Sequence, residues 1–129
     1  MSILIWCLFI TILLPILSKG PVAYAQNKLG RYDNNNPRAQ QATLTGFGAR
    51  ALAAHQNAFE SLILFAPALL LAIATNNTGS LIEQLAITHV IARLCYHILY
   101  LLNWGTLRSL VWFIGFGTTL AIVIQCLPI

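Results

Sequence analysis

The chain has 129 residues, a length typical of one domain, and a formal net charge of +4 at pH 7. Hydrophobic residues make up 58% of it and charged residues only 8%, whereas a soluble domain carries about 25% charged residues. So few charges cannot cover a water-facing surface, which predicts an all-α integral membrane protein. The basic residues are spread along the chain without a basic face between aromatic side chains, so we expect no nucleic-acid partner.

Four apolar segments follow one another, each near the ~20 residues that a helix needs to cross a bilayer. Backbone groups in lipid must be paired within their own segment, which forces helices. The expected helices span about 2–18, 46–75, 80–103 and 106–127. The stretch 19–45 is polar and rich in turn residues and is expected to be a loop. The fold class is therefore a four-helix membrane bundle.

The basic residues orient this bundle. The loop 19–45 holds a single acid, Asp33, against four basic residues: Lys19, Lys28, Arg31 and Arg38. The turn at 76–80 is uncharged, and Arg108 lies beside the third connection. Because positive residues stay on the cytoplasmic side, we expect the first and third connections there. Both termini would then face the periplasm or a lumen.

A signal peptide is the alternative reading of the N-terminus. Residues 1–25 end in AYA, which resembles a signal-peptidase site. No Lys or Arg precedes the apolar run, however, and Lys19 follows it. This is the reverse of the polarity of a signal peptide, so we expect the segment to remain a membrane helix.

The three cysteines, Cys7, Cys95 and Cys126, form no CxxC pair and no metal-binding spacing. Scattered in apolar segments, they are expected to behave as small hydrophobic residues. No cluster of histidine and acidic residues is evident either, so we expect no metal site.

The second helix carries polar residues around much of its circumference. With 3.6 residues per turn, Arg50 and Asn57 share a face, and Gln56 and Glu60 occupy an adjoining strip. His55 points nearly opposite to Asn57. Such a helix cannot face lipid on any broad side, and four short helices would hardly enclose it. The pattern therefore predicts an oligomer with this helix near its centre.

The third helix carries a polar strip with spacings of 4, 3, 4 and 3 residues, which is one helical face. It consists of His89, Arg93, Tyr96, Tyr100 and Asn103. Folding the hairpin about residue 78 brings Glu60 level with Tyr96 and within a turn of Arg93. A buried charge needs a partner, so a Glu60–Arg93 ion pair is expected.

Three strings in the sequence resemble one known family. RALAAHQNAFE (50–60) resembles the second-helix motif of the MAPEG family, the membrane-associated proteins of eicosanoid and glutathione metabolism. ARLCYHILY (92–100), followed by RS (108–109), resembles its third-helix signature. YDNNNPRAQQA (32–42) looks like the bacterial branch. The resemblance implies four-helix bundles that assemble as homotrimers, with glutathione bound between subunits near the cytoplasmic side.

The resemblance also implies roles for single residues. Asn57, Glu60 and Tyr100 match glutathione-binding positions, and Tyr96 stands where many members have a polar or histidine side chain. Arg108 matches an arginine that stabilises the glutathione thiolate, Ser109 is its neighbouring serine, and His55 matches a histidine that we expect to be structural. Arg93 joins the expected glutathione-binding set through its place on the polar strip.

The chemistry fits these residue types. An arginine suits the carboxylates of glutathione, and a glutamate suits its ammonium group. A guanidinium near the thiol favours the thiolate, which is the nucleophile. The implied function is a glutathione-dependent membrane transferase or peroxidase, acting on a lipophilic electrophile delivered from the membrane lipids.

The sequence also departs from this pattern. The family's glutathione enzymes carry basic residues at the positions of Ala53 and Gln56, and a tyrosine at that of Trp112. The alternative is therefore a non-catalytic MAPEG-like protein that binds another anionic or lipid ligand. A small ion-coupled transporter using Glu60 is a third reading, although the first and fourth helices lack matching charges.

Overall fold

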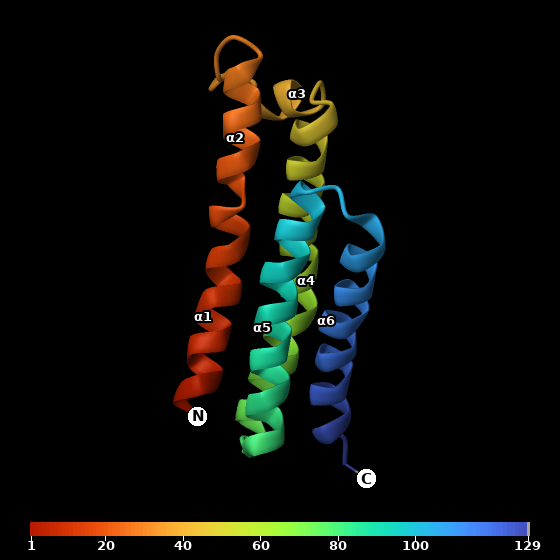
Figure 1. The fold of residues 1–129 in the computed structure, drawn as a ribbon. Helices are drawn as coiled ribbons and strands as arrows, with labels where there is room; N and C mark the ends of the chain where they lie inside the picture. The colour runs from red at the N-terminus through yellow and green to blue at the C-terminus, as the bar shows by residue number, and fades with distance from the viewer. Residues whose placement is uncertain (129) are drawn as a thin grey trace.

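A computed structural model describes residues 1–128 and contains six helices and no strand in that range. They are α1 (Ser2–Leu17), α2 (Lys19–Lys28), α3 (Pro37–Gln41), α4 (Gly46–Ala74), α5 (Ser80–Leu101) and α6 (Gly105–Gln125). Figure 1 shows α1 and α2 in line with each other, running beside α4, α5 and α6. The short α3 caps the end where α2 meets α4.

Three helical stretches are long and apolar enough to cross a membrane, namely Ser2–Lys28, Gly46–Ala74 and Gly105–Gln125. α5 has the length, with 22 residues, but its polar strip lowers its hydropathy. The long helices begin and end close to the four expected apolar ranges. The chain is thus an all-helical integral membrane protein.

The expectation of a loop across 19–45 is wrong for its first part, because Lys19–Lys28 forms α2 and continues the first helix. The sequence Gly20-Pro21 suggested a turn. Pro21 lies in the first turn of α2, where the missing N–H group has no intrahelical partner to lose. The helix therefore resumes after a break confined to Ser18, whose hydroxyl donates to the Pro15 carbonyl at 2.8 Å.

Two asparagines end the long helices and make the connections tight. Asn76 (φ 57°) and Asn103 (φ 63°) adopt the left-handed conformation that closes a helix. The following N–H groups reach back five residues, Asn77 to the Ala72 carbonyl at 2.8 Å and Trp104 to the Leu99 carbonyl at 3.0 Å. Because α5 ends at Leu101, Asn103 belongs to this turn and does not extend the polar strip.

Small residues let the helices approach one another. The buried positions of α4 are mostly alanine, which suits helix packing where lipid surrounds the bundle. On α6, a Cβ added at Gly115 would lie 3.5 Å from Cδ of Arg93, so α5 and α6 pack closely there. Many large apolar side chains on the outside of the bundle are exposed, as expected for a lipid-facing surface.

Candidate functional site

A buried arginine organises the seam between α4, α5 and α6. Arg93, on the inner face of α5, is only 4% exposed. Its Nη2 donates to Oδ1 of Asn57 at 2.5 Å and to the Asn57 carbonyl at 3.3 Å. Asn57 in turn donates through Nδ2 to Oε2 of Glu60 at 3.2 Å. The three side chains therefore form a relay in which Asn57 stands between the cation and the carboxylate.

The expected direct Glu60–Arg93 ion pair is not formed in residues 1–128, where the only ion pair within 4.0 Å joins other groups. Matching depths along the hairpin placed the two residues at nearly the same level, which is correct. The side chain of Asn57 occupies the space between them, because it lies one turn before Glu60 on the face of α4 that meets α5.

The seam contains one unsatisfied donor. Nε of Arg93 is buried and has no hydrogen-bond partner among the described residues. A buried polar group without a partner is costly, so this N–H group calls for an acceptor that residues 1–128 do not supply. The Arg93 guanidinium also lies over the Tyr96 ring, with Cζ 4.3 Å from the ring centroid.

A second arginine repeats this arrangement near the start of α6. Cζ of Arg108 lies 4.3 Å from the centroid of the Tyr100 ring. Tyr100 meets Tyr96 edge to face, with centroids 5.7 Å apart. One surface thus carries a cation, two rings and a second cation in succession: Arg93, Tyr96, Tyr100 and Arg108. Ser109 lies beside Arg108 at the end of this row.

Two cavities lie along this surface. One, of about 150 Å³, is lined by Asn57, Glu60 and Arg93 among others. The other, of about 200 Å³, is lined by Tyr96, Tyr100, Arg108 and Ser109 with their neighbours. All seven residues that the sequence indicated for catalysis and glutathione binding therefore line two adjacent hollows on the same seam.

Trp112, which stands where the family's glutathione enzymes have a tyrosine, lines both cavities. It faces the seam and stacks on Phe116, with centroids 5.3 Å apart. Its spacing on α6 agrees with this, since it lies four residues from Arg108 and one turn before Phe116.

His89 has a structural place at the inner end of the seam. Its ring stacks on Phe65, with centroids 3.8 Å apart and the planes parallel to within 1°. Nδ1 lies 2.9 Å from the Gly115 carbonyl. His89 thereby ties α5 to both α4 and α6 below Arg93.

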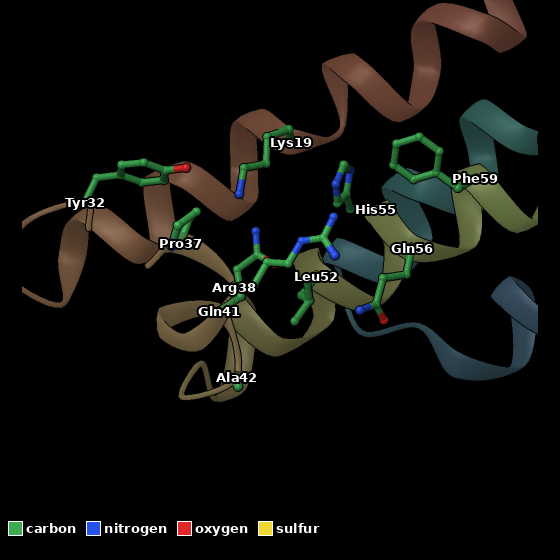
Figure 2. Close-up of a pocket in the computed structure, with 10 residues that line it drawn as sticks. All are labelled: Lys19, Tyr32, Pro37, Arg38, Gln41, Ala42, Leu52, His55, Gln56 and Phe59. Carbon is green, nitrogen blue, oxygen red and sulfur yellow. The ribbon is translucent and has the colours of Figure 1, made fainter. Parts of the chain in front are cut away.

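His55 lies away from the seam, on the side of α4 that meets the first helix. Its Nδ1 is 2.8 Å from the Ser18 hydroxyl, so it ties α4 to the break between α1 and α2. With Lys19 and Arg38 it lines a larger cavity of about 720 Å³, shown in Figure 2. No spacing in the sequence indicated that Lys19 and Arg38 would line the same cavity.

These features define the chain as an all-helical integral membrane protein with a polar, cation-rich seam between its helices. The MAPEG family model matches residues 3–128, nearly the whole chain, and the protein belongs to that family. No curated protein and no solved structure matches it. Family membership associates the chain with glutathione-related or lipid metabolism in membranes.

Proposed function

We propose that the protein is a glutathione-dependent membrane transferase or peroxidase that acts on a lipophilic electrophile. The observation that carries this proposal is the seam of Asn57, Glu60, Arg93, Tyr100 and Arg108. It offers two guanidinium groups for carboxylates, one carboxylate for an ammonium group and polar hydroxyls between them. A zwitterionic peptide with two carboxylates matches this donor set, and the unpartnered Nε of Arg93 can donate one further hydrogen bond.

In this proposal each residue has a distinct task. Asn57 holds Arg93 in place, and Glu60 takes the ammonium group of glutathione. Arg108, at the mouth of the seam, stabilises the thiolate over the thiol, and Ser109 beside it supplies a further hydrogen bond. The rings of Tyr96 and Tyr100 each lie under one guanidinium group and hold the two groups at separate positions.

The seam supports the proposal of a homotrimer with glutathione between subunits. Each cavity is smaller than the ~300 Å³ of a usual small-molecule site, so a second wall is needed. Glu60 is exposed on the single chain although it sits in a helix long enough to cross the membrane. A neighbouring subunit packed on this surface would supply the wall and shield the carboxylate from lipid.

The basic residues support a proposed orientation in a bacterial inner membrane. α2 and the segment around α3 carry four basic residues, Lys19, Lys28, Arg31 and Arg38. They lie at the end of the bundle where α6 begins, with Arg108 in its first turn (Figure 1). We place this end in the cytoplasm, where glutathione is available, and both termini in the periplasm. α5 then crosses the membrane as a fourth helix.

The test is turnover by the full chain, purified in detergent. The protein is incubated with glutathione and either a chloronitrobenzene or a lipid hydroperoxide, and products are followed by mass spectrometry. Conjugate or reduced lipid above the uncatalysed rate, lost in Arg108→Ala, supports the proposal. Rates no higher than the uncatalysed rate would remove the enzymatic claim, and equal catalysed rates in both proteins would remove the role of Arg108.

A second candidate is a non-catalytic MAPEG-like membrane protein that binds another anionic or lipid ligand. Ala53 and Gln56 favour it, because basic residues stand at these positions in the family's glutathione enzymes. Gln56 lines the larger cavity beside His55 and contributes nothing to the seam. Saturable glutathione binding without any product would select this candidate.

A further inference from the structure

A further cavity, of about 390 Å³, lies between the end of α2 and the start of α4. Its volume falls within the ~300–1,000 Å³ range of small-molecule sites. It shares no lining residue with the seam or with the cavity beside His55. At 3.6 residues per turn, Tyr24, which lines it, lies about 140° around α2 from Lys19, which lines the cavity beside His55. The two cavities are therefore on different sides of α2.

The walls of this cavity are aromatic and aliphatic. Tyr24 of α2 meets Phe47 of α4 edge to face, with ring centroids 6.5 Å apart, and both rings are exposed. Gly48 lies where the two helices touch, because a Cβ added there would be 3.0 Å from Cβ of Ala25 and 2.9 Å from Cδ2 of Leu44. A ligand in this cavity would thus lie between two exposed rings, against a tightly packed floor.

The cavity carries a single positive charge. Among residues 1–128, Lys28 is the only charged residue that lines it, and the only ion pair joins other groups. Nζ of Lys28 lies 5.3 Å from the centroid of the Tyr24 ring. Thr45 also lines the cavity, and its side chain makes no capping bond to α4. The lining is therefore complementary to an anionic group attached to an apolar one.

The length of the first helical stretch places this cavity at headgroup level. Ser2–Lys28 has 27 residues and at ~1.5 Å per residue is about 40 Å long, whereas the hydrocarbon core of a bilayer is ~30 Å thick. The surplus of about 10 Å extends from the end at Lys28, where the basic residues gather. Lys28 is therefore expected among the lipid headgroups, with Tyr24 one turn nearer to the hydrocarbon.

One face of this helical stretch changes from apolar to basic toward the cavity. Ile10, Leu17 and Tyr24 recur every seven residues and Lys28 follows one turn later, so the four side chains share a face. All four are exposed. Figure 1 shows α1 and α2 in line with each other, which keeps this face continuous. It offers a path for an acyl chain from the membrane interior to the cavity.

We propose that this cavity binds the headgroup of an anionic phospholipid, in the leaflet at the basic end of the bundle. Lys28 pairs with the phosphate, and the Thr45 hydroxyl donates to one of its oxygens. The rings of Tyr24 and Phe47 contact the glycerol region, and one acyl chain follows Leu17 and Ile10. This lipid site is separate from the proposed glutathione site.

The experiment is native mass spectrometry of the full chain, purified in a mild non-ionic detergent, which resolves individual lipid adducts and the oligomeric mass. The probes are dioleoyl-phosphatidylglycerol and the uncharged-overall dioleoyl-phosphatidylcholine. The variants are Lys28→Gln, the conservative Lys28→Arg, and the matched control Arg31→Gln, which removes a charge from the same segment outside the cavity. Both Lys28 and Arg31 have exposed side chains, so these changes should leave folding intact.

We expect phosphatidylglycerol to bind in preference to phosphatidylcholine, and about fivefold more weakly in Lys28→Gln. Lys28→Arg and Arg31→Gln should keep the affinity of the unchanged chain, and saturating glutathione should not displace the lipid.

The proposal is overturned if the chain shows no preference for phosphatidylglycerol, or if Arg31→Gln weakens binding as much as Lys28→Gln. It is also overturned if glutathione displaces the lipid, because the cavity would then belong to the glutathione site. Loss of the oligomer in Lys28→Gln without a change in lipid preference would mean that a second copy of the chain covers the cavity, and would equally overturn it.

Discussion

The relay from Arg93 through Asn57 to Glu60 can be tested by two double-mutant cycles. In the first, Asn57→Ala and Arg93→Met are made singly and together. In the second, Glu60→Ala replaces Asn57→Ala. Each cycle isolates the free energy that couples the two side chains.

The structure sets the expected magnitudes. The Arg93–Asn57 hydrogen bond carries a full charge and is largely buried, and such bonds contribute ~1.5–3 kcal/mol. Interhelical hydrogen bonds in membranes reach up to ~1.7 kcal/mol. We therefore expect a coupling of about 1–2 kcal/mol between Arg93 and Asn57. Glu60 reaches Arg93 only through Asn57, so their coupling should stay below about 0.5 kcal/mol.

The assay is unfolding in mixed micelles of a mild detergent and dodecyl sulfate, followed by far-ultraviolet circular dichroism. Arg93→Met should destabilise the protein less than Asn57→Ala. The first change removes the buried charge, whereas the second leaves that charge without its hydrogen-bond partner. A coupling between Glu60 and Arg93 as large as that between Asn57 and Arg93 would refute the relay. Strict additivity of Asn57→Ala and Arg93→Met would do the same.

Three further predictions use thermal unfolding of the detergent-purified protein. Gly115→Ala should be tolerated, because the added Cβ would lie at an ordinary 3.5 Å from Cδ of Arg93. Gly115→Leu should lower the free energy of unfolding by about 1–3 kcal/mol. Equal effects of the two changes would mean that α5 and α6 are not in close contact there. Asn76→Gly should leave stability unchanged and Asn76→Ala should lower it by about 1 kcal/mol, since φ is 57°; a neutral alanine would contradict the left-handed turn. Phe65→Ala should cost about 3–5 kcal/mol, because this fully buried ring stacks on His89, and a loss below 1 kcal/mol would argue against that packing.

Hydropathy and helical periodicity predicted much of the architecture. Lipid imposes helices on apolar segments, so the positions of the four long helices followed from the sequence with small errors at their ends. The spacing of Arg93, Tyr96 and Tyr100 also placed these side chains on one face, and the structure has all three lining the seam. These features depend on local repeats, which a single sequence displays.

Other features depend on contacts between segments far apart in the chain. Gly20-Pro21 has the composition of a turn, yet α2 is helical because Gln26 is buried against the segment around α3. Matching depths identified Arg93 and Glu60 as neighbours but could not show that Asn57 lies between them. Lys19 and Arg38 are separated by a loop whose path is set by Asp33 and Gln40, so their shared cavity was not predictable from spacing.

In the proposed function the seam binds glutathione with Arg108 against its thiol. The most direct test is calorimetric titration of glutathione into the detergent-purified protein, beside Arg108→Ala and the control Arg31→Ala outside the seam. We expect saturable binding that Arg108→Ala weakens by about tenfold or more and that Arg31→Ala leaves unchanged. No binding up to millimolar glutathione, with the protein folded and oligomeric, would contradict it.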